Sequence, residues 1–218
     1  MAKGKSKASV SSYSNSLSNL MSYELDGLEF IVRNEKELEQ ADEKVNDFFG
    51  DSWEKSLTKD ERDVIEEYSG GGYVFMNGAL RHGNIKGQDE DIATMDKAIA
   101  KADLKEDIIV RRLSSPELLG LKTNSLEEFN KANLIGAIVS DKAYVSTAVI
   151  GEGLMKYNSS VSYRIKVPKG KGRGAYISNV AKIRGEFEYV IKRGSSFRIT
   201  GARKVGKFLQ VDMEVIDE

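Results

Sequence analysis

Two carboxylates lie two residues apart in the sequence Arg184-Gly185-Glu186-Phe187-Glu188. In an extended strand successive side chains point to opposite faces, so we expect Glu186 and Glu188 on one face and Phe187 in the core. Carboxylates roughly 6–7 Å apart suit glycosidic-bond chemistry, because one can stabilise an oxocarbenium-like centre while the other handles a proton on the nucleophile. Charges that alternate along a solvent-exposed strand give the same pattern, so the pair alone does not establish a site.

Two arginines and two hydroxyls are further candidates. Arg111-Arg112 follows the apolar residues 108–110, and an arginine at the end of a buried strand can hold a phosphate with two hydrogen bonds. Ser146-Thr147 stands near the end of residues 144–148, a predicted strand. Taken separately, a surface ion pair explains the arginines and a strand edge explains the hydroxyls.

The composition excludes several other chemistries. The 218 residues contain no cysteine and a single histidine, His82. Thiolate nucleophiles, disulfides and cysteine zinc sites are therefore excluded, and a Ser-His-Asp triad or a histidine-rich metal site is disfavoured. Catalysis must rest on carboxylates, hydroxyls, arginine, lysine or tyrosine, and we expect no metal.

Charge and hydropathy limit the partners. With 33 basic and 34 acidic residues, the chain lacks the basic excess with which nucleic-acid-binding proteins neutralise phosphates. No apolar run approaches the roughly 18–20 residues that span a bilayer. Residues 1–22 hold eight serines, which predicts a flexible tail, and they lack the apolar segment of a cleavable signal. We predict no nucleic-acid or membrane partner, and a cytoplasmic protein or one delivered by a signal-less route.

Helical periodicity dominates the first half of the chain. Apolar side chains recur every three or four residues from Asn34, and Thr58-Lys59-Asp60-Glu61 is a capping box that predicts the start of a second helix. We expect Gly70-Gly71-Gly72 to interrupt the helix. Further helices are predicted over residues 73–81, over residues 92–102 and from Ser125.

The second half changes to the two-residue alternation of half-buried strands. It appears in residues 161–167, 187–191 and 209–215, after a short buried strand at residues 108–110. Helices followed by strands, without regular strand–helix alternation, favour an α+β fold with a mostly antiparallel sheet. We predict one domain over residues 23–218, after the tail of residues 1–22.

The order of these features is more specific than any one of them. An arginine after a strand, a strand ending in Ser-Thr and a Glu-x-Glu pair resemble the Arg–Ser–Glu class of mono-ADP-ribosyltransferases. The similarity is greatest to the enzymatic domains of clostridial binary toxins and vegetative insecticidal toxins. It extends from about Glu35 to the C-terminus and includes four further stretches, at residues 73–81, 163–169, 174–178 and 192–199. The resemblance implies N-terminal helices packed on a mostly antiparallel, two-sheet β core.

The resemblance implies transfer of ADP-ribose from NAD⁺ to a protein side chain, with release of nicotinamide. Glu188 would be the catalytic glutamate, which hydrogen-bonds the nicotinamide-ribose 2′-hydroxyl and stabilises the cationic ribose. Glu186 would orient or deprotonate the acceptor, and a glutamate there goes with arginine acceptors in this family. The implied partner is a target protein with an acceptor arginine, and we expect the enzyme to be a monomer.

The resemblance also implies the contacts with NAD⁺. Arg111 and Arg164 would bind the phosphates, and Ser146 would brace the catalytic glutamate and the ribose. The segment between Thr147 and Val161 resembles the phosphate–nicotinamide loop, and Arg184-Gly185 the turn that meets the target. The remaining expected NAD⁺-binding residues are Arg112, Asn77 and Arg81.

Two positions depart from the family pattern. Its Ser-Thr-Ser is Ser146-Thr147-Ala148 here, and Val110 replaces the aromatic residue that often precedes the first arginine. The second departure leaves open whether Arg111 or Arg112 is the key residue. Two other functions also stay open: an NAD⁺ glycohydrolase, in which water replaces the protein acceptor, and a non-enzymatic interaction module on the same fold.

Overall fold

The computed structural model describes residues 23–25, 28–30, 35–150, 161–183 and 185–217. Helices occupy much of the first half of the chain and strands most of the second, and the α+β class with a mainly antiparallel sheet is confirmed. The predicted tail of residues 1–22, most of the predicted phosphate–nicotinamide loop and Arg184 lie outside the described residues. The assignment of residues 23–218 to one domain stays a prediction.

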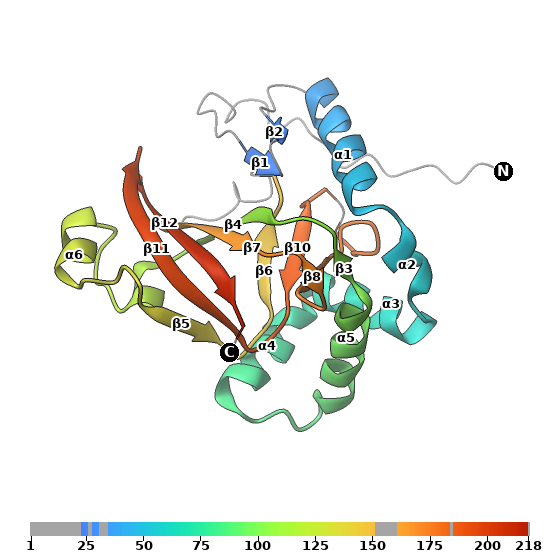
Figure 1. The fold of residues 1–218 in the computed structure, drawn as a ribbon. Coiled ribbons are helices and arrows are strands. Elements are labelled where there is room, and N and C mark those ends of the chain that lie inside the picture. Colours follow the sequence, from blue (N-terminus) through green and yellow to red (C-terminus); the bar gives the residue numbers. More distant parts are fainter. Residues whose placement is uncertain (1–22, 26–27, 31–34, 151–160, 184, 218) are drawn as a thin grey trace.

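The helices lie close to their predicted positions, and most of them pack beside the sheet while α6 lies at its far end (Figure 1). Gly70-Gly71-Gly72 interrupts the regular helix as expected, because Gly71 has a φ of 121° within a π-helical turn, η2. The bounds are α1 Glu35–Phe49, α2 Ser52–Ser56, α3 Lys59–Glu67, η2 Tyr68–Gly72, α4 Tyr73–His82, α5 Asp89–Lys101, the 3₁₀ turn η3 Pro116–Leu119 and α6 Leu126–Lys131.

Within the described residues eight strands form one sheet in the order β5-β11-β12-β7-β4-β6-β10-β9, and two short pairs, β1-β2 and β3-β8, lie outside it. The bounds are β1 Tyr23–Leu25, β2 Leu28–Phe30, β3 Asp103–Leu104, β4 Ile108–Ser114, β5 Ile138–Asp141, β6 Val145–Ala148, β7 Val161–Val167, β8 Gly170–Lys171, β9 Gly174–Tyr176, β10 Glu188–Ile191, β11 Ser195–Val205 and β12 Phe208–Ile216.

The large sheet has two halves. Among the described residues β4 and β6 share one register pair, Arg111 with Ala148, whereas β4 and β7 pair from Ile108 to Ser114. The expected two sheets are therefore the groups β5-β11-β12-β7-β4 and β6-β10-β9, joined into one hydrogen-bonded order at that pair. β12 and β7 run parallel, and the other pairs given for this sheet are antiparallel.

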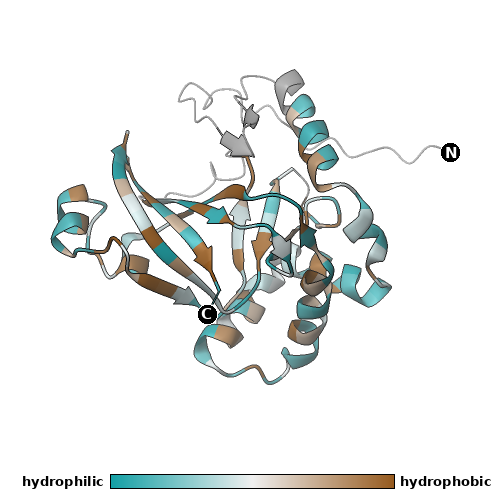
Figure 2. Cartoon of the chain, viewed as in Figure 1, coloured by the Kyte–Doolittle hydropathy of each residue, from teal (hydrophilic) through white to brown (hydrophobic). Residues whose placement is uncertain are grey.

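Two apolar clusters form the core, and they meet opposite faces of β10. In β10, Tyr189 and Ile191 belong to one cluster, and Val190 belongs to the other, which includes buried side chains of α3, α4 and α5. This division follows from strand geometry, because successive side chains point to opposite faces. Figure 2 shows brown and teal segments mixed along the strands and in bands on the helices.

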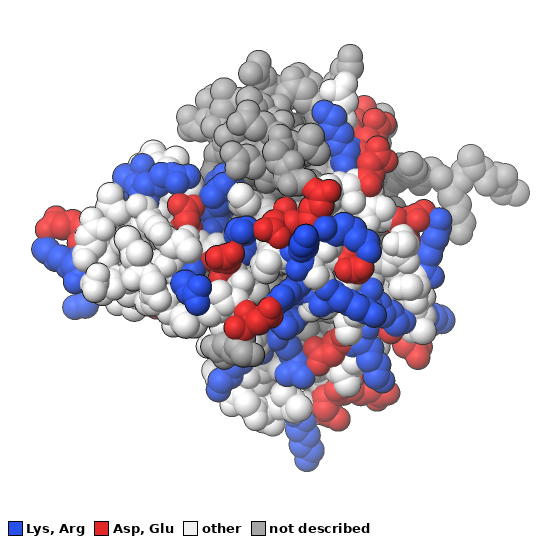
Figure 3. All heavy atoms as spheres, viewed as in Figure 1, with Lys and Arg blue, Asp and Glu red and all other residues white. Residues whose placement is uncertain are grey.

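Charged side chains of both signs occur on the face of the molecule drawn in Figure 3. On the face drawn in Figure 3, Lys and Arg side chains lie next to Asp and Glu side chains. No helix in the described segments is long and apolar enough to cross a membrane. The same part of the chain contains no group of three or more His, Cys, Asp or Glu residues that could hold a metal ion.

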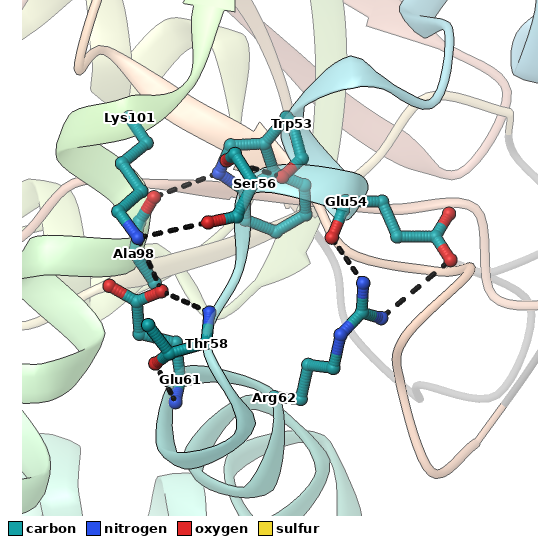
Figure 4. Close-up of polar contacts among 8 residues, drawn as sticks. All are labelled: Trp53, Glu54, Ser56, Thr58, Glu61, Arg62, Ala98 and Lys101. Atoms are coloured by element: carbon teal, nitrogen blue, oxygen red, sulfur yellow. Dashed lines mark hydrogen bonds and ion pairs between the residues drawn. The ribbon is translucent and has the colours of Figure 1, made fainter.

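A polar network fixes the start of α3 against α5 (Figure 4). The predicted capping box is confirmed: Thr58 Oγ1 accepts the Glu61 N–H at 3.3 Å, and Glu61 Oε2 accepts the Thr58 N–H at 2.7 Å. Lys101 Nζ donates to the same carboxylate at 2.6 Å, and Trp53 donates to Ala98 O at 2.8 Å. Burial raises the pKa of Glu61, but Lys101 and Thr58 outweigh it and hold the pKa below its ordinary value.

Replacing the cap hydroxyl should destabilise the fold measurably. We expect Thr58→Ala to lower the free energy of unfolding by about 1 kcal/mol, because the Glu61 N–H loses its acceptor. Thr58→Ser keeps the hydroxyl and is the matched control. Urea denaturation at pH 7 measures both, and an alanine variant as stable as the serine variant would show that the cap contributes nothing.

Candidate active site

A row of directly paired residues crosses four strands and includes three of the predicted site residues. Arg164 in β7 pairs with Arg111 in β4, Arg111 pairs with Ala148 in β6, and Ala148 pairs with Glu188 in β10. Paired residues share a face, and neighbouring strands are about 4.8 Å apart, so Glu188 lies roughly 10 Å from Arg111 along the row. Ser146, two residues before Ala148, shares that face.

The two arginines lie inside β4 rather than after it, because the strand continues to Ser114. Arg111 is buried and lies on the row, next to Arg164, whose guanidinium is 3.7 Å from Asp212. Arg112 leaves the opposite side of the strand, and its Nη1 donates to Ser146 O at 2.8 Å. Both arginines therefore lie at the junction of the two halves, and each has a different set of neighbours.

A cavity of about 330 Å³ lies between η2, α4, β4, β6 and the turn before β10. Six of the eight predicted site residues line it, and Arg111 and Arg164 are not among its described lining residues. The described lining residues are Tyr68, Ser69, Tyr73, Asn77, Arg81, Arg112, Leu113, Ser114, Ser146, Thr147, Ala148, Glu186 and Glu188.

Glu188 is the most enclosed carboxylate of this cavity, with 8 % of its surface exposed. It accepts a hydrogen bond from Ser146 Oγ, and its own N–H donates to Ser178 Oγ at 2.6 Å. Burial raises its pKa to about 7; the Ser146 hydrogen bond and Arg112 oppose this rise, and the charge of Glu186 adds to it. A carboxyl in this state ionises readily when a cation forms beside it.

The segment that joins the two glutamates is a turn, so the extended geometry predicted for it was wrong. Strand β10 begins only at Glu188, and Phe187 has a φ of 49°, which is costly for a bulky side chain. Phe187 is nevertheless buried as predicted, and its carbonyl accepts the Val149 N–H at 2.9 Å. Burial and this hydrogen bond hold the turn, which leaves half-buried Glu186 on the wall of the same cavity.

Asn77 and Arg81 lie one turn apart on α4 and therefore face the same side. Asn77 Nδ2 donates to Tyr68 OH at 3.2 Å, and its Oδ1 accepts the Tyr144 N–H at 3.2 Å, which fastens α4 to the chain just before β6. Arg81 donates to both oxygens of Asp141, at 3.0 and 2.7 Å. Burial, assisted by the charge of Glu188, raises the pKa of Tyr68, so its hydroxyl stays protonated.

A second cavity, of about 300 Å³, shares Arg81 and Arg112 with the first. Its other walls are mainly apolar side chains of η3, β5, β7 and β11, including Leu119, Tyr163 and Phe197. Two guanidinium groups thus separate a polar cavity with carboxylates from an apolar one.

Sequence reasoning missed Tyr68 and Ser178. Tyr68 belongs to an apolar helix face in the sequence pattern, and Ser178 ends a stretch of family resemblance without a role of its own. Their contacts with Asn77 and Glu188 join segments 9 and 10 residues apart through turns. No spacing rule identifies such contacts.

Residues 46–215 match the model of a family described as ADP-ribosyltransferase exoenzyme. The chain belongs to this family. Its members are transferases that use NAD⁺ as their substrate, so the resemblance predicted from the sequence is confirmed. No curated protein sequence matches the chain.

Solved structures of bacterial toxins share the fold. Plx2a, an ADP-ribosyltransferase toxin from Paenibacillus larvae, is 23 % identical with a TM-score of 0.72, over 83 % of this chain and 96 % of that one. BECa of a C. perfringens binary enterotoxin is 24 % identical (TM-score 0.71) over 90 % of this chain, which spans 55 % of BECa. The C3 exoenzyme of Clostridium limosum is 20 % identical (TM-score 0.67), over 84 % of this chain and 95 % of that one.

The raised pKa of Glu188 has a testable consequence for stability. The folded-state pKa of Glu188, about 7, lies above the ordinary value of 4.5. The stability that the neutral carboxyl contributes is therefore fully present below pH 4.5 and is lost as the pH rises through about 7. Glutamine is neutral at every pH. The free energy of unfolding of Glu188→Gln, relative to that of the wild type, should therefore rise by roughly 2–3 kcal/mol between pH 5 and pH 8. Denaturation of both proteins at the two pH values tests this, and a pH-independent difference would refute it.

Proposed function

We propose that this protein transfers ADP-ribose from NAD⁺ to an arginine side chain of a target protein. The observation that carries the proposal is the meeting of Glu186 and Glu188 in one cavity, with Ser146 hydrogen-bonded to Glu188. Arg111 and Arg164 on the same row of the sheet supply positive charge at a fixed distance from Glu188. A monomer that acts in the cytoplasm of the producing, infected or target cell stays a prediction from the sequence.

NAD⁺ suits this arrangement because its scissile bond and its diphosphate are separated by one ribose. With the nicotinamide ribose at Glu188, the diphosphate reaches the arginines roughly 10 Å along the row. The similar fold of BECa has been solved with NADH, and that of a protein from S. aureus, with a TM-score of 0.68, has been solved with NAD.

The reaction breaks the bond between C1′ of the ribose and the nicotinamide nitrogen. The bonding electrons leave with nicotinamide, and the ribose becomes an oxocarbenium-like cation. The Glu188 carboxylate stabilises this cation, while Ser146 holds the carboxylate and Arg112 holds the strand that carries Ser146. Nicotinamide carries a positive charge in NAD⁺, so donor binding favours the ionised form of Glu188.

The acceptor nitrogen then attacks C1′ and loses a proton to Glu186. A guanidinium group fits this step because a carboxylate both attracts its charge and accepts its proton. Glu186 is half-buried on the cavity wall, where a side chain from another protein can reach it. If water attacks instead, the same geometry yields an NAD⁺ glycohydrolase.

Two glutamine variants separate these roles. Glu188→Gln should reduce both nicotinamide release and transfer by at least about 100-fold, because the charge that stabilises the cation is removed. Glu186→Gln should reduce transfer to agmatine, a small guanidinium acceptor, far more than it reduces hydrolysis of NAD⁺. Glu127→Gln, an exposed change on α6, is the control. Equal losses of transfer and hydrolysis in Glu186→Gln would mean that it has another role.

Two lysine variants separate the arginines of β4, since lysine keeps the charge but loses the two-pronged hydrogen-bonding geometry. Arg111→Lys should raise the KM for NAD⁺ at least tenfold with little change in kcat. Arg112→Lys should also lower kcat, because Arg112 fixes the strand that carries Ser146. Steady-state nicotinamide release measures both, with exposed Arg198→Lys as control. An unchanged KM in Arg111→Lys would remove this residue from the phosphate site.

A further inference from the structure

The first turn of α4 exposes three large apolar side chains in succession. Tyr73, Val74 and Phe75 are 44, 58 and 72 % exposed, and Phe75 is the most exposed large apolar residue among those that the structure describes. The helix does have a buried side, formed by residues that include Met76 and Leu80. Adjacent large apolar residues in solvent are typical of interaction surfaces. We call Tyr73, Val74 and Phe75 the apolar rim.

The turn before α4 fixes the direction of the rim. Gly71 has a φ of 121°, and a Cβ at Gly72 would lie 2.8 Å from the Glu67 carbonyl oxygen, so the backbone here needs glycine. Ser69 Oγ accepts the Lys182 N–H at 2.8 Å, which ties this turn to the segment before Glu186. This hydrogen bond joins the turn before the rim to the segment that leads to Glu186.

The rim is continuous with the wall of the cavity. Tyr73 lines the cavity together with Glu186, and Val74 and Phe75 continue from it into solvent. A protein whose acceptor residue reaches Glu186 must therefore bring neighbouring residues against the first turn of α4. The carboxylates of Glu66 and Glu67, at the end of α3, are exposed just before the turn. The surroundings thus combine apolar contact area with negative charge.

We infer that the apolar rim binds the acceptor protein through large apolar side chains that flank a basic acceptor residue. The inference rests on the proposed function, because it assigns part of the acceptor's binding energy to a surface outside the cavity. Aromatic and apolar side chains that lose water at the centre of an interface contribute most to binding. The rim selects among acceptors, and the cavity performs the chemistry.

Two fluorescein-labelled peptides test the inference: an arginine flanked by phenylalanine and leucine, and an arginine flanked by glycine and serine. Fluorescence anisotropy with the full chain should show at least tenfold tighter binding of the apolar peptide. The double variant Val74→Ser/Phe75→Ser should lose this preference. Ile135→Ser, which changes a side chain that is 60 % exposed and does not line either cavity, should keep it. Equal binding of the two peptides, or a preference that survives in the double variant, would overturn the inference.

Transfer to agmatine, measured on the same preparations, keeps the two proposals distinct. Agmatine has no apolar flank, so the rim variant should retain the wild-type kcat/KM for it, which also shows that the variant is folded. If agmatine is modified but the rim does not select the apolar peptide, the inference fails and the proposed function stands. If the rim selects the apolar peptide and agmatine is never modified, the proposed acceptor chemistry fails and the docking surface stands.

Discussion

The pairing of Arg111 with Ala148 determines the geometry of the site, and within the described residues it is the one register pair between β4 and β6. One half of the sheet contributes Arg111 and Arg164, and the other contributes Ser146 and Glu188. A shift of one residue at this junction would turn Arg111 to the opposite face and separate it from Glu188. The small side chain of Ala148, between them, lines the cavity that holds Glu188. Ala148 replaces the last serine of the family's Ser-Thr-Ser pattern, so the position without the hydroxyl lies in the middle of the site.

The site is built at a cost in stability. Glu188 is buried with a pKa of about 7, Phe187 has a left-handed backbone, and both are held by contacts from other segments: Ser146, Ser178 and Val149. A buried carboxyl and a strained backbone persist only where many contacts from the surrounding structure hold them. The two apolar clusters and the hydrogen bond from the Tyr144 N–H to Asn77, which fastens α4, provide that support. The resulting rigidity places two carboxylates where a cation forms.

Features encoded in local spacing were predictable. The capping box at Thr58, the helix that carries Asn77 and the alternation in β7 and β12 depend on near neighbours in the chain, and all three are confirmed. Strand β4 extends to Ser114 because it pairs with β7, some 50 residues later in the chain. Local spacing does not contain this pairing, so it places Arg111 and Arg112 after the strand instead of within it. The turn at Phe187 and the exposure of Phe75 likewise depend on distant segments, and no local pattern indicates either.

A crystal structure of the Glu188→Gln variant with NAD⁺ would show directly where the donor binds. The variant should bind the donor without consuming it, because it keeps the size of residue 188 and removes its charge. The proposed donor site places the nicotinamide ribose within hydrogen-bonding distance of residue 188 and Ser146, with the diphosphate against Arg111 and Arg164. A dinucleotide bound elsewhere, or a diphosphate that contacts neither arginine, would contradict it.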